Sequence, residues 1–131
     1  MGWRHFTEIR AWQLSMELER EFSVILARPP ACLNRKFCEE ALDPAASAPR
    51  NIAEGFGRYG NREFANFVNI ARGSQLETQT NLVLSKNRRY MTEEEFNRLW
   101  PISEEMVKTT AGLLRELRRR GAGPHKRRID G

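Results

Sequence analysis

Apolar residues recur at helical spacing along most of the chain. Periodic segments predict four helices, at about 7–27, from 34 to the glycines at 55–60, at 61–87 and at 92–120. No segment alternates apolar and polar residues as a half-buried β-strand does. Four helices with short connections favour an all-α fold, an antiparallel up-down-up-down four-helix bundle. We therefore expect one bundle domain over residues 1–120 and a flexible basic tail over residues 121–131.

The ends of these helices carry local signals. Pro29 and Pro30 end the first helix, because proline cannot continue the hydrogen-bond ladder. Asn34 is a good N-cap for the second helix. Thr92, with Glu95 three residues later, forms a capping box for the fourth.

The second helix contains residues that disturb helices. Pro44 and Pro49 each remove a backbone donor, so we expect a kink or a break there. Gly55, Gly57 and Gly60 predict its end, through the left-handed conformation that C-caps use. The single proline of the fourth helix predicts a bend.

The first helix is apolar over a wide face. Ile9, Trp12, Met16 and Phe22 form one stripe, and three leucine or isoleucine residues form a second stripe beside it. Such a face exceeds one bundle seam and suits a contact between subunits. Because cyclic symmetry buries such a surface without forming filaments, we expect a closed homo-oligomer.

The positive charge of the chain lies at its C-terminal end. The net charge is +5, and the residues from 115 onward hold seven bases and two acids, which is the whole excess. These bases are Arg115, Arg118, Arg119, Arg120, Lys126, Arg127 and Arg128. They would bind nucleic acid by neutralising phosphates, or form a solvated terminus that keeps the protein soluble. The stretch has no aromatic residue to stack on bases, so we expect any binding to lack sequence specificity.

Composition and spacing argue against several classes of protein. No apolar run approaches the roughly 18 residues of a membrane span, and the first residues lack an apolar signal core, so we expect a cytoplasmic protein without membrane contact. Cys32 and Cys38 are too few for a disulfide framework and are expected to be reduced. No histidine lies near them in sequence, and no phosphate-binding loop is present. We therefore expect no metal, no cofactor and no catalytic centre.

One pair of residues has the spacing of a catalytic motif. Arg120 and His125 match the Arg-x4-His motif of helical-bundle ribonucleases. The residues between them are Gly-Ala-Gly-Pro, which predict a disordered segment that cannot hold the imidazole at a scissile phosphate. An RNA-processing nuclease is therefore a minor alternative.

Two polar clusters stand out in the second and third helices. Their main members are Asn51, Glu54, Gly55 and Arg58 in the first cluster, and Arg72 and Glu77 in the second. Glu54 and Arg58 fit an i,i+4 pair, which contributes only a few tenths of a kcal/mol when exposed. In a hairpin of the two helices, Arg72 lies roughly 12 Å beyond the residue opposite Glu54, at 1.5 Å per residue. The polar groups therefore pair locally or, as we favour, contact a neighbouring subunit.

The same clusters carry a family resemblance. The relevant stretches are Phe6-Thr-Glu-Ile-Arg-Ala-Trp12-Gln13, Asn51-Ile-Ala-Glu-Gly-Phe-Gly-Arg58, Ile70-Ala-Arg-Gly-Ser74 and Glu77-Thr-Gln79. They resemble a bacterial four-helix-bundle family first known from reading frames in intervening sequences of large-subunit ribosomal RNA genes. The resemblance implies an antiparallel bundle that assembles into a homopentamer. Relatives include the accessory protein of diversity-generating retroelements, a basic pentameric barrel that binds a reverse transcriptase and nucleic acid.

These observations predict a non-enzymatic, oligomeric scaffold or binding protein. Its expected partners are further copies of itself and RNA or DNA. The resemblance adds a nucleic-acid enzyme such as a reverse transcriptase. The main alternative is a purely structural oligomer without a nucleic-acid partner.

Overall fold

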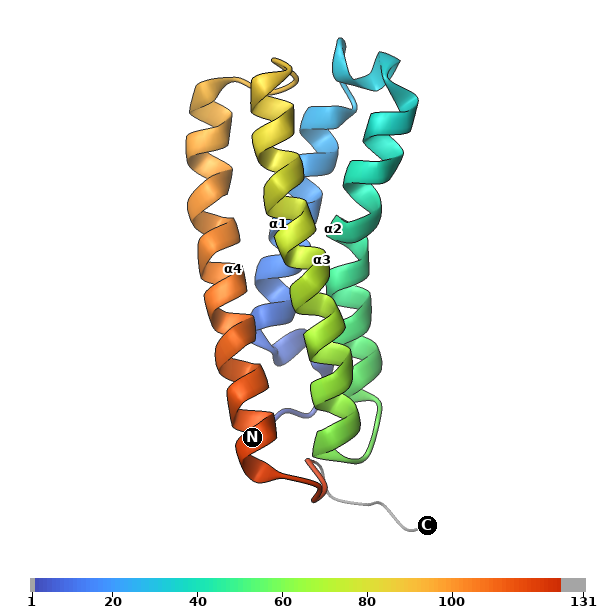
Figure 1. Cartoon of the computed structure of the whole chain (residues 1–131), viewed down its shortest axis with the longest axis vertical. Helices are drawn as coiled ribbons and strands as arrows, with labels where there is room; N and C mark the ends of the chain where they lie inside the picture. Colours follow the sequence, from blue (N-terminus) through green and yellow to red (C-terminus); the bar gives the residue numbers. More distant parts are fainter. Residues whose placement is uncertain (1, 126–131) are drawn as a thin grey trace.

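The chain forms four long helices that pack side by side. The computed structural model describes residues 2–125, and its helices are η1 (Phe6–Glu8), α1 (Arg10–Leu26), η2 (Ala31–Leu33), α2 (Arg35–Phe56), α3 (Asn61–Asn87) and α4 (Glu93–Arg120). Successive long helices run in opposite directions (Figure 1). The predicted all-α, up-down-up-down four-helix bundle is confirmed.

The bundle has two ends with different connections. The α1–α2 and α3–α4 connections lie together at the top of Figure 1, and we call this the loop end. The α2–α3 turn and the last turn of α4 lie together at the bottom, and we call this the turn end.

The predicted caps are present in the structure. The Asn34 side chain accepts from the Phe37 amide at 3.2 Å and begins α2. Thr92 and Glu95 form the capping box of α4: the Glu95 amide donates to Thr92 Oγ1 at 3.0 Å, and the Thr92 amide donates to Glu95 Oε1 at 2.8 Å. These bonds satisfy amides that the first helical turn leaves without partners, so they define where the helix starts.

The first helix starts later than predicted. His5 and Glu8 cap a separate 3-10 turn, η1, and Ile9 is extended (φ −77°, ψ 120°) before α1 begins. Ile9 is fully buried. The extended residue therefore turns an isoleucine side chain into the core, which a continuous helix from Thr7 would not do in the same way.

Of the expected kink or break in α2, the break is wrong. The helix continues through Pro44 and Pro49, and both proline rings are buried. Each internal proline costs about 3 kcal/mol in an isolated helix. Here α2 packs between α1 and α3, and burial of the two rings offsets part of that cost. α4 likewise runs through Pro101 without interruption.

The glycines of α2 do not act as left-handed caps. The C-cap Gly57 has φ −67°, a right-handed helical value, so the predicted mechanism is wrong. Gly55 lies inside the helix against α3, where an added Cβ would come within 2.7 Å of the Phe67 Cβ and 2.9 Å of Phe64 Cδ1. A glycine at position 55 therefore lets the two helices approach closely.

The core consists of two apolar clusters separated by buried polar side chains. One cluster, around Phe22 and Leu99, lies towards the loop end, and the other, around Ile52 and Phe64, lies towards the turn end. Between them, Gln75 Nε2 donates to Ser15 Oγ at 3.1 Å and to Thr110 Oγ1 at 2.8 Å, and all three residues are buried. This layer explains why the second half of α3 is so polar in sequence.

Candidate functional site

The last turns of α4 present four exposed arginines at the turn end. Glu116 accepts from Arg119 at 2.7 and 2.9 Å and from Arg120 at 2.9 Å. Hydrogen bonds from Arg119 and then Arg120 lower the pKa of Glu116 to about 2. Arg115 and Arg118 form no ion pair with any residue between 2 and 125. Of the α4 arginines, these two are therefore the ones available for an external anion.

The predicted tail is only partly described. Lys126, Arg127 and Arg128, which the sequence analysis also assigns to nucleic-acid binding, lie outside the described residues. The segment 121–125 differs from the expected flexible tail, because it returns and pairs with the α2–α3 turn. The Asn61 amide donates to the Gly123 carbonyl at 2.8 Å, and the His125 amide donates to the Tyr59 carbonyl at 3.1 Å.

The His125 side chain is held in place by packing. It is 8% exposed, and its ring lies 4.7 Å from the Phe64 ring and 5.6 Å from the Phe56 ring. Its Nε2 lies against the Arg58 carbonyl oxygen. Packing therefore holds this imidazole, where the sequence predicts a disordered segment. Its surroundings nevertheless give no support to the nuclease alternative, because the ring faces an aromatic pocket and Arg120 is bound by Glu116.

Sequence reasoning missed two residues at the turn end. Arg62, in the first turn of α3, lines a groove of about 210 Å³ together with Asn66, Arg118 and Gly121. Tyr59, in the α2–α3 turn, is 40% exposed. Both lie far in sequence from the basic C-terminal stretch, so the charge count from residue 115 onward could not include them. The signal that was available is the cluster Arg58-Tyr59-Gly60-Asn61-Arg62.

The first motif cluster is joined to the second through a serine. Asn51 Nδ2 donates to the Ser47 carbonyl at 2.9 Å and to Ser47 Oγ at 3.0 Å. Ser74 Oγ, from the second cluster, donates to Ser47 Oγ at 3.1 Å. The two clusters therefore do meet within one chain at this point, which the hairpin argument did not foresee. Glu54 and Arg58 form the predicted i,i+4 pair at 3.0 Å, and both are exposed.

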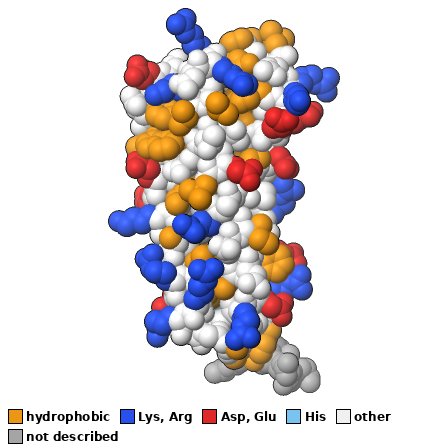
Figure 2. Space-filling model, viewed as in Figure 1, with side chains coloured by type: hydrophobic (Ala, Val, Ile, Leu, Met, Phe, Trp, Pro, Cys, Tyr) orange, Lys and Arg blue, Asp and Glu red, His pale blue; other side chains and the backbone are white. Residues whose placement is uncertain are grey.

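The second motif cluster lies beside an apolar stripe on the solvent face of α3. Ile70, Leu76 and Val83 are 54%, 43% and 36% exposed, although each is a large apolar side chain. Arg72 precedes Leu76 by four residues and Glu77 follows Gly73 by four, so both exposed charges lie on the helix surface beside this stripe. Figure 2, in which α3 crosses the front, shows apolar side chains interspersed with charged ones on this face.

Gly73 lies within the same stripe. An added Cβ there would have no atom within 4 Å, so nothing inside the monomer requires a glycine. Glycine in an exposed helix interior costs roughly 1 kcal/mol relative to alanine. Gly73 therefore lowers the stability of the helix, and no contact within the described monomer explains why a glycine is present.

A second apolar surface lies between α1 and α2. Trp12 and Met16, from the wide face predicted for the first helix, are half-buried and line a groove of about 510 Å³. Pro49 of α2 forms part of its wall, and Glu19 and Arg50 lie at it as the charged members. Ile9 and Phe22, from the same predicted stripe, are instead in the core.

Three further features of the described part of the chain concern metal binding, membrane spanning and the two cysteines. Among residues 2–125, no group of three His, Cys, Asp or Glu side chains is placed to hold a metal ion. No described helix is long and apolar enough to cross a membrane. Cys32 and Cys38 are free thiols, and burial raises the pKa of Cys38, whose Sγ donates to the Ala31 carbonyl at 3.2 Å.

Fold and surface together define a helical-bundle protein with exposed apolar faces and a basic end. The chain belongs to the 23S rRNA-intervening sequence protein family, whose family model matches residues 7–112. The resemblance inferred from the motifs is therefore confirmed. The matched region ends before Arg115, so the four arginines of the last turns of α4 and the segment 121–125 lie outside it.

A solved structure shares this fold. It is a protein of unknown function from the S23 ribosomal protein family of Bacteroides thetaiotaomicron VPI-5482, with a TM-score of 0.68 and 23% identity, over 79% of this chain and 97% of that chain. No curated protein matches the chain. Neither match names an enzymatic activity.

Proposed function

We propose that the protein is a non-enzymatic scaffold that works as a closed ring of identical subunits. The observation that carries the proposal is the exposed apolar stripe of α3, Ile70, Leu76 and Val83, with Gly73 in open space among them. Three large apolar side chains exposed on one helix of a small protein favour an interaction site there. A glycine in that surface permits close approach of a second helix, which would explain its cost.

The second apolar surface supplies the complementary half of the interface. The α1–α2 groove is mostly apolar. Its charged members Glu19 and Arg50 are opposite in sign to Arg72 and Glu77, respectively, which lie beside the stripe. Because stripe and groove are different surfaces of one chain, their pairing is head-to-tail. Such an interface generates a ring when the rotation between subunits closes. The number five comes from the family resemblance.

The test is the mass of the protein in solution. Light scattering at micromolar concentration should give a single species of about five times the 15.2 kDa of one chain. The double variant Ile70→Asp/Leu76→Asp should give a folded monomer. Val24→Asp, the same kind of change at a 67% exposed residue of α1, should leave the mass unchanged.

The alternatives predict different results. A wild-type monomer at this concentration would contradict the ring itself. A double variant that stays oligomeric would place the interface elsewhere.

Nucleic-acid binding is a second candidate function, favoured by the arginines of the turn end. Arg62, Arg115 and Arg118 carry charge that no acid within residues 2–125 neutralises. In a ring with cyclic symmetry, all copies would present these charges on one side, and many phosphate contacts make affinity fall steeply with salt. A nucleic-acid enzyme such as a reverse transcriptase belongs to the same proposal through the family resemblance.

The tail is tested best by a short deletion. Removing residues 126–131 takes away three bases and one acid and leaves the segment packed on the α2–α3 turn in place. Weaker RNA binding with a smaller salt slope would show that the tail contacts phosphate. Unchanged binding would make the tail a solubility device. No RNA or DNA binding by the full chain would favour the purely structural oligomer.

A further inference from the structure

The turn end brings two arginines and an aromatic ring together from three elements. Arg62 of α3 and Arg118 of α4 line one groove, whose floor contains the buried Ala65 and Leu117. At the edge of this groove lies Gly121, whose φ of +73° turns the chain back after α4. The segment then runs to His125, whose amide is bonded to Tyr59.

This short segment fixes the spacing between the groove and Tyr59. His125 follows Gly121 by four residues, so the two points are at most about 14 Å apart. The segment is tied down at both Asn61 and Tyr59, by bonds of 2.8 and 3.1 Å, and by the buried His125 ring. The groove and Tyr59, whose backbone is held at this spacing, therefore share one surface at the turn end.

We propose that this surface is a binding site for single-stranded nucleic acid, in which Arg62 and Arg118 contact a phosphate and Tyr59 stacks on a nearby base. The proposal deepens the proposed nucleic-acid function and rests on it. It replaces the expectation that the basic end lacks an aromatic residue, because the fold delivers Tyr59 from a distant part of the sequence.

The residue types favour a nucleotide over other anions. The planar guanidinium matches phosphate oxygens with two parallel donors. Arg62 and Arg118 have no carboxylate partner within residues 2–125, whereas Arg119 and Arg120 are bound by Glu116, and Arg58 by Glu54. A phosphate alone, as in a lipid headgroup, gives the exposed ring of Tyr59 nothing to stack on.

The exposed ring also favours single strands over duplexes. Bases in a duplex are stacked on one another, so an aromatic side chain reaches their faces only where the strand is open. Stacking on an aromatic side chain contributes about 1–3 kcal/mol per base, and it tolerates any base. The site should therefore accept RNA or DNA single strands with little sequence preference.

The experiment measures binding of a short oligouridine, a duplex of the same length, and vesicles of phosphatidylcholine with phosphatidylserine, at low and moderate salt. Tyr59→Ala should weaken oligouridine binding about fivefold or more, which is the lower limit of one stacking interaction. It should leave the salt slope unchanged, and Tyr59→Phe should bind like the wild type. Arg62→Ala/Arg118→Ala should reduce the salt slope by about 0.7, for the one single-strand phosphate that the two arginines share.

Matched controls separate this site from general charge. Arg119→Ala removes a neighbouring arginine that is already bound by Glu116, so it should change binding less than either Arg62→Ala or Arg118→Ala. The duplex should bind the wild type and Tyr59→Ala equally well. Vesicles should compete poorly with the oligouridine.

Three results would overturn the site and leave the broader function standing. They are oligouridine binding that Tyr59→Ala does not weaken, an equal loss in Arg119→Ala, and vesicles that compete as well as RNA. Salt-dependent RNA binding without any effect of Tyr59 would show that only the site is wrong. A wild-type protein that binds no nucleic acid at low salt would overturn both the site and the nucleic-acid function.

Discussion

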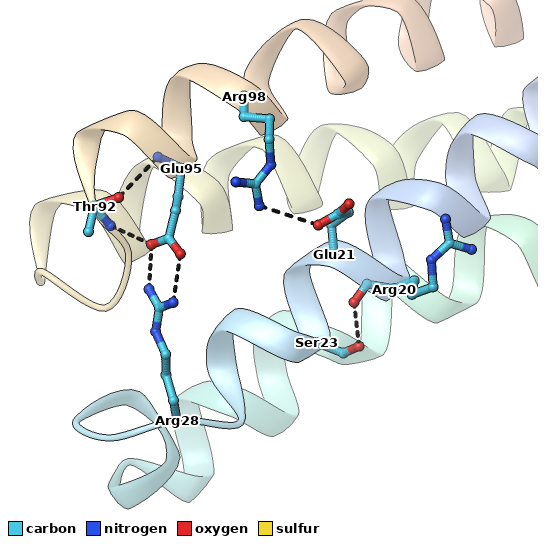
Figure 3. A network of polar contacts seen from close by, with 7 residues as sticks. All are labelled: Arg20, Glu21, Ser23, Arg28, Thr92, Glu95 and Arg98. Atoms are coloured by element: carbon cyan, nitrogen blue, oxygen red, sulfur yellow. Dashed lines mark hydrogen bonds and ion pairs between the residues drawn. The ribbon is translucent and has the colours of Figure 1, made fainter.

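Arginine is used differently at the two ends of the bundle. At the loop end, Arg28 of the α1–α2 connection makes a two-pronged contact with Glu95 in the first turn of α4, and Arg98 of α4 contacts Glu21 of α1 at 3.3 Å (Figure 3). At the turn end, Arg62 and Arg118 line a groove and have no acidic partner among residues 2–125. Arg28 and Arg98 are thus structural at the loop end, whereas Arg62 and Arg118 are available for a ligand at the turn end.

The difference follows from where the acids lie. α4 begins with Glu93, Glu94 and Glu95, which suit the positive end of the helix dipole and are then available to Arg28. α4 ends with Arg118, Arg119 and Arg120, which suit the negative end, and only Glu116 lies within the last two turns to neutralise them. Helix-dipole preferences thus leave a surplus of positive charge at the turn end.

The largest expected effect concerns the close helix approach at the turn end. Gly55→Ala should destabilise the protein by about 2–3 kcal/mol, because the new Cβ would meet Phe67 Cβ at 2.7 Å and the helices must move apart. Denaturant unfolding followed by circular dichroism measures the change. The matched control is Gly73→Ala, where the Cβ enters open space.

The control should move stability in the opposite direction. In the Ile70→Asp/Leu76→Asp background, which should be monomeric, Gly73→Ala should stabilise by up to about 1 kcal/mol through helix propensity. Equal losses at both glycines would show that the contact of α2 with α3 at Gly55 has no special role.

The next effect concerns the carboxylate at the loop end. Hydrogen bonds from Arg28 and then from Thr92 hold the pKa of Glu95 at about 2, below its ordinary value of 4.5. A lowered carboxyl pKa stabilises the fold above pH 4.5, and the contribution is lost as the pH falls towards 2. Glu95→Gln should therefore cost about 1–2 kcal/mol at neutral pH, allowing for solvent screening at the half-exposed Arg28.

The pH dependence separates this pair from an ordinary surface contact. Between pH 4.5 and 2 the wild type should lose stability more steeply than Glu95→Gln, since the variant has no proton to gain there. Glu21, the partner of Arg98, is more exposed than Glu95. Glu21→Gln should therefore cost less stability than Glu95→Gln. Parallel pH profiles for wild type and Glu95→Gln would contradict a structural role of the Arg28 contact.

Local sequence signals were sufficient for the elements whose ends are set by neighbouring residues. The capping box at Thr92 and Glu95 and the N-cap at Asn34 act within one turn, so the sequence displays them directly. Pro44 and Pro49 show the limit of local reasoning, because their burial between helices outweighs their intrinsic cost.

The candidate site is formed by residues far apart in sequence, so local sequence patterns could not predict it. His125 packs against Phe56 and Phe64, more than sixty residues away, and its flanking glycines and proline have the composition of a loop. Arg28 reaches Glu95 across 67 residues. Arg118 was predicted because it lies in a charged run, whereas Tyr59 and Arg62 join it only once α2, α3 and α4 are placed together.

The smallest expected effect on stability is the loss of an arginine at the turn end. Arg118→Ala and Arg62→Ala should each change the free energy of unfolding by less than about 0.5 kcal/mol, because neither side chain has an ion-pair partner to lose within the described chain. Arg118 lies near the C-terminal end of α4, so it interacts favourably with the helix dipole, but salt screens that contribution.

Arg28→Ala at the other end should cost clearly more, since it leaves the mostly buried Glu95 without its main partner. Urea titrations of the three variants at moderate salt make the measurement, with equal denaturant slopes as the check on two-state unfolding. If Arg118→Ala is as destabilising as Arg28→Ala, then the arginines of the turn end hold the fold together, and they are not available to a ligand.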